Sequence, residues 1–169
     1  MNATPPATAN SVRIDHLLPE TLHETTSTGA VTSPLLEACL EIRRAVFVLG
    51  QAIPLELEID GLDAEAEHFL AVRETMAGDL AIGTARLRLL AGGAKVERVA
   101  VLEEFRGNDI GWRLMRAVEA RARDLGMPCT RLHAQLAVVP FYDKLGYVAE
   151  GDVFDEAGIP HRAMHKLLA

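Results

Sequence analysis

Residues 97–111 read ERVAVLEEFRGNDIG, and this stretch predicts a short apolar strand that passes through a glycine-containing turn into a helix. The helix is expected over residues 110–125, with apolar side chains on one face and arginines on the other. Gly126 ends it, and Pro128 blocks its continuation. The first backbone N–H groups of a helix are unpaired and lie at the positive end of its dipole. The turn is therefore a candidate phosphate site.

The segments around this stretch alternate between apolar runs and turn residues. A helix is expected to begin at Ser33, a natural N-cap, and Pro34, with apolar residues at helical spacing as far as Phe47. Strands are expected at residues 11–18, 68–73, 80–90, 95–101, 131–136, 147–151 and 163–168, and a short helix at 139–145. This order predicts an α/β (α+β) fold, with a mixed, mostly antiparallel twisted sheet flanked by helices.

Length and composition are typical of a single globular domain. The chain has 169 residues, 49% of them hydrophobic, and we expect one domain over residues 11–169 after a disordered tail at 1–10. We expect no membrane span and no secretory signal. Two cysteines, Cys39 and Cys129, make no disulfide framework, so the cytoplasm is the expected compartment. The net charge of −7 argues against a nucleic-acid partner.

A second motif follows the central helix, where residues 140–147 read PFYDKLGY. Together with the turn at residues 106–111, it resembles the coenzyme-A-binding core of the GNAT superfamily of acyl-CoA N-acyltransferases. That family has the pattern Gln/Arg-x-x-Gly-x-Gly/Ala in the turn, so Arg106 and Gly111 match, whereas Asp109 replaces the central glycine. The resemblance covers roughly residues 35–168. Within the family, the chain most resembles a bacterial branch whose acceptor substrates are mostly undefined.

The resemblance implies acetyl-CoA as the co-substrate. Backbone N–H groups of the turn would bind its pyrophosphate, and the preceding strand would pair with its pantetheine arm as an added strand does. The implied cofactor contacts are Val99, Ala100, Val101, Arg106, Gly107, Asn108, Asp109, Ile110, Gly111 and Phe141. Asp109 leaves an alternative open. Its carboxylate could cap the helix and repel phosphate, which would leave a weakened or inactive GNAT-fold module acting as a sensor.

Amine acylation needs two proton transfers, and two residues are the candidate catalytic groups. A lysine-like amine has a pKa of about 10.4, so supplying its neutral form at pH 7 costs about 4.6 kcal/mol. Tyr142 matches the family tyrosine that reaches the departing thiol sulfur, although it could instead be a core aromatic. Glu97 has the strand parity of Val99 and Val101, which predicts a shared face and a role as base. The alternative is an exposed glutamate paired with Lys95 or an arginine.

The acceptor site is expected from acidic residues and from the strand after the central helix. Glu58 and His68, with the acidic residues at positions 56–63, could form an anionic pocket for an ammonium group, or simply a solvated loop. His133 and Gln135 alternate beside the expected site and are the other candidate substrate contacts. His133 could also be a base, or a structural histidine with its hydrogen bonds satisfied.

The remaining features exclude two kinds of chemistry. His161 and His165 lack a third ligand, so we expect no metal site. The motif places no cysteine at the reactive centre, which favours direct attack by the amine within a ternary complex. The sequence thus predicts an N-acetyltransferase acting on a small-molecule amine or a protein amine. Family habit suggests a homodimer.

Overall fold

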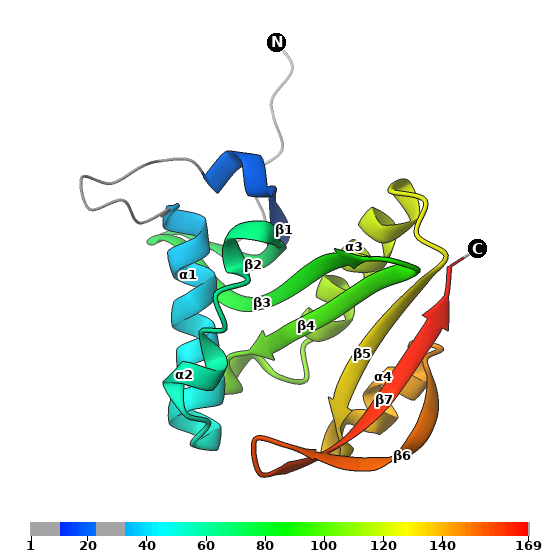
Figure 1. Cartoon of the computed structure of the whole chain (residues 1–169). Coiled ribbons are helices and arrows are strands. Elements are labelled where there is room, and N and C mark those ends of the chain that lie inside the picture. Colours follow the sequence, from blue (N-terminus) through cyan, green and yellow to red (C-terminus); the bar gives the residue numbers. More distant parts are fainter. Residues whose placement is uncertain (1–10, 23–32, 169) are drawn as a thin grey trace.

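The computed structural model describes residues 11–22 and 33–168, and seven strands within them form one sheet in the order β1-β2-β3-β4-β5-β7-β6 (Figure 1). Only β4 and β5 pair in parallel, and every other neighbouring pair is antiparallel. The expected mixed, mostly antiparallel sheet is therefore confirmed, whereas the tail expected at 1–10 lies outside the described residues. The strands are β1 (Val12–Leu17), β2 (Glu67–Thr75), β3 (Gly78–Leu90), β4 (Gly93–Val101), β5 (Cys129–Gln135), β6 (Val148–Glu156) and β7 (Ile159–Leu167).

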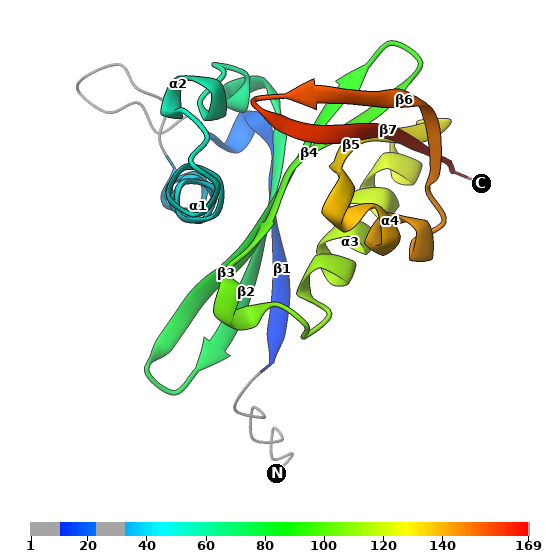
Figure 2. The same cartoon turned by 90° about the horizontal axis from the view of Figure 1, so that it is seen from below.

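Helices cover the sheet from both sides (Figure 2). α1 (Pro34–Arg43) continues into a π-helical segment, Arg44–Leu49, and lies with the short α2 (Leu55–Glu58) on one side. α3 (Ile110–Asp124) and α4 (Val139–Lys144) lie on the other. Each side has its own apolar core, because α1 packs on β2–β4 and α3 packs across the middle of the sheet. None of the helices in the described part of the chain has both the length and the apolar character needed to cross a membrane.

The N-cap expected at Ser33 is confirmed in position, and a second local expectation needs correction. Ser33 occupies the N-cap position of α1, but its side chain makes no capping hydrogen bond, and its backbone carbonyl instead accepts the Glu37 N–H at 2.9 Å. The acidic residues at 56–63, for which a solvated loop is one alternative, instead include the helix α2 and lead into a 3₁₀ turn at Asp63–Glu65. Ion pairs to Arg43, Arg86 and Arg98 hold this segment against α1, β3 and β4.

A β-bulge interrupts β4 at Arg98. Glu97 pairs with Arg86 of β3, whereas Ala100 pairs with Thr84, so three steps on β4 oppose two on β3. Arg98 takes up the extra length with a left-handed backbone, at φ 53°. An extra residue in one strand reverses the in–out alternation of all the side chains that follow it.

The bulge overturns the expected parity of β4. Val99 and Val101 pack with the core beneath α3, and Ala100 packs with the core beneath α1. Glu97 precedes the bulge and lies on the α1 side with Ala100. The prediction that Glu97 shares a face with Val99 and Val101 is therefore wrong. Glu97 faces α1 and α2, and the two valines face α3.

β4 and β5 pair over only two positions. Ala94 pairs with Thr130 and Lys95 with Arg131, and beyond these pairs the two strands part (Figure 1). Their approach is close at this end, because a Cβ atom on Gly93 would lie 2.7 Å from the Cys129 sulfur. Among the described residues, one edge of β4 therefore has no strand partner from Val96 to Val101.

Candidate active site

A cleft of about 910 Å³ occupies the space where β4 and β5 part. It is bounded by the free edge of β4, the first turn of α3, α4, the segment before α2 and the β6–β7 turn. Segments from both sides of the sheet line this cleft, namely the π-helical segment after α1 together with α2 from one side, and α3 and α4 from the other.

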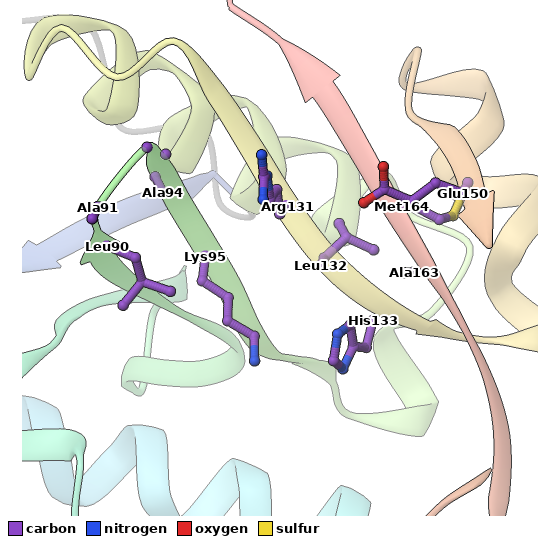
Figure 3. Close-up of a pocket in the computed structure, with 12 residues that line it drawn as sticks. Leu90, Ala91, Ala94, Lys95, Arg131, Leu132, His133, Glu150, Ala163 and Met164 are labelled. Atoms are coloured by element: carbon purple, nitrogen blue, oxygen red, sulfur yellow. The ribbon is translucent and has the colours of Figure 1, made fainter. Parts of the chain in front are cut away.

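A smaller cavity of about 260 Å³ lies where the two strands begin to part (Figure 3). It shares Lys95, Leu132 and His133 with the cleft, and Arg131 of β5 and Glu150 of β6 also line it. Lys95 from β4 and His133 from β5 project to the same side of the sheet (Figure 3). These two side chains therefore lie at the junction of the two cavities.

The turn before α3 forms the end of the cleft where phosphate was expected. Gly107 and Asp109 both have left-handed backbones, with φ of 78° and 58°. Asp109 occupies the N-cap position and is exposed, yet its side chain makes no capping hydrogen bond among the described residues. The proposal that its carboxylate caps the helix is therefore wrong, and that carboxylate does not occupy the N–H groups of the first turn.

The other residues of the turn are held by local contacts. The Asn108 side chain donates to two carbonyls of its own turn, and Arg106 Nε donates to the Val101 carbonyl at 3.1 Å. A Cβ on Gly111 would lie 3.3 Å from the Phe141 ring, so glycine here permits close contact between α3 and α4. The turn, α4 and the end of β4 thus form one wall of the cleft.

The free edge of β4 fits an extended ligand. Val99, Ala100 and Val101 line the cleft, and past Lys95 this edge faces no strand. Backbone groups on such an edge can pair with an added strand or with a chain of amide groups. That Val99, Ala100 and Val101 hold a pantetheine arm stays a prediction.

Tyr142 lies on α4 against this wall. Its side chain is 7% exposed, lines the cleft, and makes edge-to-face contacts with Phe141 at 5.0 Å and Tyr147 at 5.7 Å. Burial raises the pKa of Tyr142 well above its usual range, so its hydroxyl keeps its proton at neutral pH. Within residues 11–22 and 33–168 that hydroxyl has no hydrogen-bond partner. It is therefore free to donate to a group in the cleft.

Glu97 lines the cleft but is bound to three cations. Its carboxylate lies 2.9 Å from Arg86 Nη2, 2.8 Å from Arg88 Nε and 3.1 Å from Lys95 Nζ. Burial by itself raises the pKa of Glu97, but the three cations outweigh burial and hold that pKa below its usual value. A carboxylate stabilised in this way accepts a proton weakly. Its role as base stays a prediction.

The acidic segment is neutralised from within. Glu58 pairs with Arg43 and Arg98, and its distance to Arg98 Nε is 2.8 Å. Asp60 lies 2.6 Å from Arg86 Nη2 and 3.2 Å from Arg98 Nη2. Asp63 likewise pairs with two of these buried arginines. The expected anionic pocket is therefore wrong in its physical basis, because these carboxylates already hold arginines.

His68 lies away from the cleft. It is fully buried, its Nε2 lies 2.9 Å from the Asp63 backbone carbonyl, and burial lowers its pKa. Glu58 reaches the margin of the cleft, but it does so as a partner of Arg43. The structure thus separates His68 from the other expected acceptor contacts and uses Glu58 to fasten α2 to α1.

His133 and Gln135 both line the cleft, on the face of β5 that looks toward α1 and α2. The Gln135 amide exchanges hydrogen bonds with Gln51, at 2.8 and 3.4 Å. His133 Nδ1 lies 2.8 Å from the Glu156 carboxylate of β6. Alternation along β5 was enough to predict that His133 and Gln135 share a face. Their partners come from distant segments that no local pattern connects.

Comparison with known proteins identifies the family. The sequence matches the acetyltransferase (GNAT) domain family over residues 47–168. The chain belongs to the GNAT family of acetyltransferases. YjcF of Bacillus subtilis, named an uncharacterized N-acetyltransferase, is 39% identical over 132 residues, which cover 78% of this chain and 91% of YjcF.

Solved structures agree with this assignment. An acyl-CoA N-acyltransferase from Pseudomonas aeruginosa has a TM-score of 0.71 and 27% identity, over 94% of this chain and 99% of its own. A Bacillus anthracis structure in complex with acetyl coenzyme A resembles this chain in fold alone, with a TM-score of 0.53, 21% identity and coverage of 61% and 62%. The expected GNAT fold and the assignment as an acyltransferase are thus confirmed.

One cleft residue of this GNAT chain escaped sequence reasoning. His161 on β7 lines the cleft beside His133 and Gln135, and it pairs with Gln135 across the β5–β7 ladder. From the sequence, His161 is weighed only as a metal ligand, and no role in acylation is predicted for it. Gly158 marks the β6–β7 turn in the sequence, and a histidine three residues after that turn lies near the start of β7.

Proposed function

We propose that this GNAT chain transfers the acetyl group of acetyl-CoA to a primary amine, by direct attack of the amine within a ternary complex. The observation that carries the proposal is the cleft itself. It extends from the α3 N-terminus along the free edge of β4 to Tyr142, whose hydroxyl is protonated and unpaired among the described residues.

The two sides of the sheet suggest the direction of the reaction. Tyr142 belongs to the α3–α4 side, where it packs with the main core. His133 and Gln135 lie on the opposite side, with Gln51 against them. In the proposed reaction the amine approaches from the α1–α2 side. The thiolate of coenzyme A departs toward Tyr142, which supplies a proton.

The walls on the acceptor side favour an amine with an apolar substituent. Phe47, Ile53 and Leu57 line that part of the cleft. The nearby acidic groups are held by arginines, so they offer little to a polycation. A protein amine is the second candidate, favoured by the exposed Leu49 and Leu55 close to this wall in sequence.

The first experiment combines binding with turnover. Acetyl-CoA is titrated into the protein by calorimetry, and thiol release is then followed with 2-phenylethylamine, spermidine and a lysine-containing peptide as acceptors. We expect saturable acetyl-CoA binding and the fastest release with 2-phenylethylamine. Spermidine as the best acceptor would contradict the apolar wall. Binding without release for any amine would favour the sensor alternative.

We also propose a cytoplasmic location, supported by two buried cysteines that are free in the described structure, Cys39 and Cys129. A homodimer remains a proposal from family habit, and sedimentation velocity of the purified chain tests it directly.

A further inference from the structure

We infer that His161 is the group that accepts the proton of the acceptor amine. This inference rests on the proposed function and adds a catalytic base to it. The base sits on β7, on the opposite side of the sheet from Tyr142.

The ring of His161 is oriented by a hydrogen bond to the backbone. Its Nδ1 lies 2.8 Å from the Ile159 carbonyl oxygen, and a carbonyl oxygen can only accept. Nδ1 therefore carries the hydrogen, so the neutral ring keeps its lone pair on Nε2. Fixing one ring nitrogen in this way is how proteins select the tautomer of a catalytic imidazole.

The Nε2 atom of His161 is available to a ligand in the cleft. The side chain is 9% exposed and lines the cleft, and the Phe154 ring stacks beside it with centroids 6.1 Å apart. Within the described residues no hydrogen bond to Nε2 is found, and Nε2 is not sealed from solvent either. The one polar atom of the ring without a partner is thus the atom that a base requires.

His161 also lies on the correct face of the sheet. It pairs with Gln135 of β5, whose side chain bonds Gln51 from the segment before α2. This is the side from which the amine approaches, whereas Tyr142 packs on the α3–α4 side. Base and acid are therefore placed on opposite sides of the gap where β4 and β5 part.

The other candidate bases are more fully engaged. Glu97 is bound to Arg86, Arg88 and Lys95, so its charge is already compensated. His133 bonds the Glu156 carboxylate and is 39% exposed, which places it at the rim, in contact with water.

The proposed step balances in atoms and charge. The ammonium loses one proton to His161 Nε2, which passes it to solvent. The neutral nitrogen attacks the thioester carbon, a C–N bond forms, and the C–S bond then breaks. Of the two protons left on nitrogen, one remains in the amide. The other is released as Tyr142 protonates the thiolate and regains a proton from solvent, so the net products are amide, thiol and one proton.

The test compares two amines of nearly equal size. 2-Phenylethylamine is mostly ammonium at pH 7, whereas the fluorines of 2,2-difluoro-2-phenylethylamine lower its pKa and leave far more of it neutral. His161→Asn keeps a side-chain N–H for the Ile159 carbonyl and removes the base. We expect kcat/KM to fall about 100-fold for the first amine and far less for the second. Acetyl-CoA affinity should not change, and added imidazole should restore part of the rate.

The controls separate His161 from its neighbours. His165→Asn lies on the same strand outside the cleft, where His165 pairs with Glu150, and it should retain wild-type rates with both amines. Equal losses with both amines in His161→Asn would indicate a structural role and overturn the inference. So would the amine-dependent loss appearing in His133→Asn or Glu97→Gln instead.

Two further outcomes distinguish the inference from the proposed function. An active wild type whose ¹⁵N histidine spectrum shows hydrogen on Nε2 of His161 would overturn the inference alone. A wild type that releases no thiol with any amine, yet binds acetyl-CoA, would overturn the proposed function, and the role of His161 with it.

Discussion

Asp109 shows how one residue can depart from a family pattern at little structural cost. The backbone at this position is left-handed, at φ 58°, a conformation that explains why glycine suits it. Aspartate is among the few other residues that visit this region, because its short polar side chain can form local hydrogen bonds. Its carboxylate nevertheless stands at the positive end of α3, where phosphate is expected.

Asp109→Gly should therefore improve both stability and acetyl-CoA binding. We expect the free energy of unfolding to rise by about 0.5–1 kcal/mol, because glycine has no Cβ to strain. Affinity should increase severalfold, as a negative charge leaves the phosphate site. Asp109→Asn is the matched control, since it removes the charge and keeps the backbone preference. Urea unfolding and calorimetry measure the two effects, and unchanged affinity in both variants would end the repulsion argument.

Tyr142 and Tyr147 form a matched pair for testing the proposed acid. The Tyr142 hydroxyl has no partner in the described chain, whereas the Tyr147 hydroxyl accepts a hydrogen bond from Thr130 at 2.9 Å. Tyr142→Phe should lower kcat about 100-fold with little change in acetyl-CoA affinity or stability. Tyr147→Phe should instead cost about 1 kcal/mol of stability and leave turnover intact. An unaltered kcat in Tyr142→Phe would remove this tyrosine from the mechanism.

At the scale of elements, the hydrophobic pattern predicts the strands and helices, but it does not predict irregularities such as the β-bulge at Arg98. Alternation and glycine turns predicted all seven strands, although β6 ends five residues later and β7 begins four residues earlier than expected. The helix expected at 110–125 agrees with α3 within a residue. The bulge at Arg98 has no local signature, because arginine is an unusual residue for a left-handed backbone. One unseen bulge was enough to place Glu97 on the wrong face.

The site was predicted best where it is local in sequence. The turn before α3 (except Asn108), the end of β4 and Tyr142 all line the cleft, and the roles expected of them stay predictions. The acceptor side depends on contacts between distant segments, such as Gln51 with Gln135, which single-sequence reasoning does not reach. Arg43 did give a clue, because an arginine at an apolar position of a helix, near an acidic segment, is typical of a buried ion pair.

The junction of β4 and β5 yields a prediction about packing. A Cβ on Gly93 would lie 2.7 Å from the Cys129 sulfur and 3.1 Å from its carbonyl oxygen. Gly93→Ala should lower stability by about 1–3 kcal/mol, as overpacking does. Adding Cys129→Ala should recover part of this loss, because it removes the sulfur but not the carbonyl. Denaturant unfolding of both single variants and the double variant gives the coupling, and strict additivity would contradict the contact.

At the scale of the whole molecule, a buried charge cluster joins the two layers of the fold. Arg43 of α1 and Arg86 of β3 are fully buried and share the carboxylate of Asp63. Arg86 also binds Asp60 and Glu97. Because the charges alternate in sign, each is compensated by neighbours, and the acidic segment becomes part of the folded structure.

Replacing Arg86, the cation at the centre of the cluster, should show how much the stability of the fold depends on these ion pairs. Arg86→Met leaves three carboxylates without one of their partners and should cost about 3–5 kcal/mol in stability. Arg13→Met is a suitable control, because Arg13 forms ion pairs at the surface and should cost less than about 1 kcal/mol. Thermal and urea unfolding compare the two, and equal losses would contradict the importance of burial.

The same cluster predicts sensitivity to acid. Arginine and lysine partners outweigh burial and hold the pKa values of Asp63 and Glu97 below their usual range. A carboxyl group with a depressed folded pKa stabilises the fold above its unfolded pKa, and this stabilisation is lost as the pH falls. The free energy of unfolding should thus decline below about pH 4. The decline should be shallower in Asp63→Asn. An identical slope in the variant would mean that Asp63 does not contribute to the loss of stability in acid.

β4 and β5 pair at only two positions and separate after Lys95. The position of the cleft is therefore set by the backbone of these two strands. In the proposed reaction, the side of the cleft that would bind acetyl-CoA is therefore set by the sheet itself. The opposite rim is built from side chains of α2 and the β6–β7 turn. If the proposed function holds, substitutions in those two short segments should change which amine is accepted and leave the β4–β5 pairing intact. The choice of acceptor would then be separable from the binding of the acyl donor.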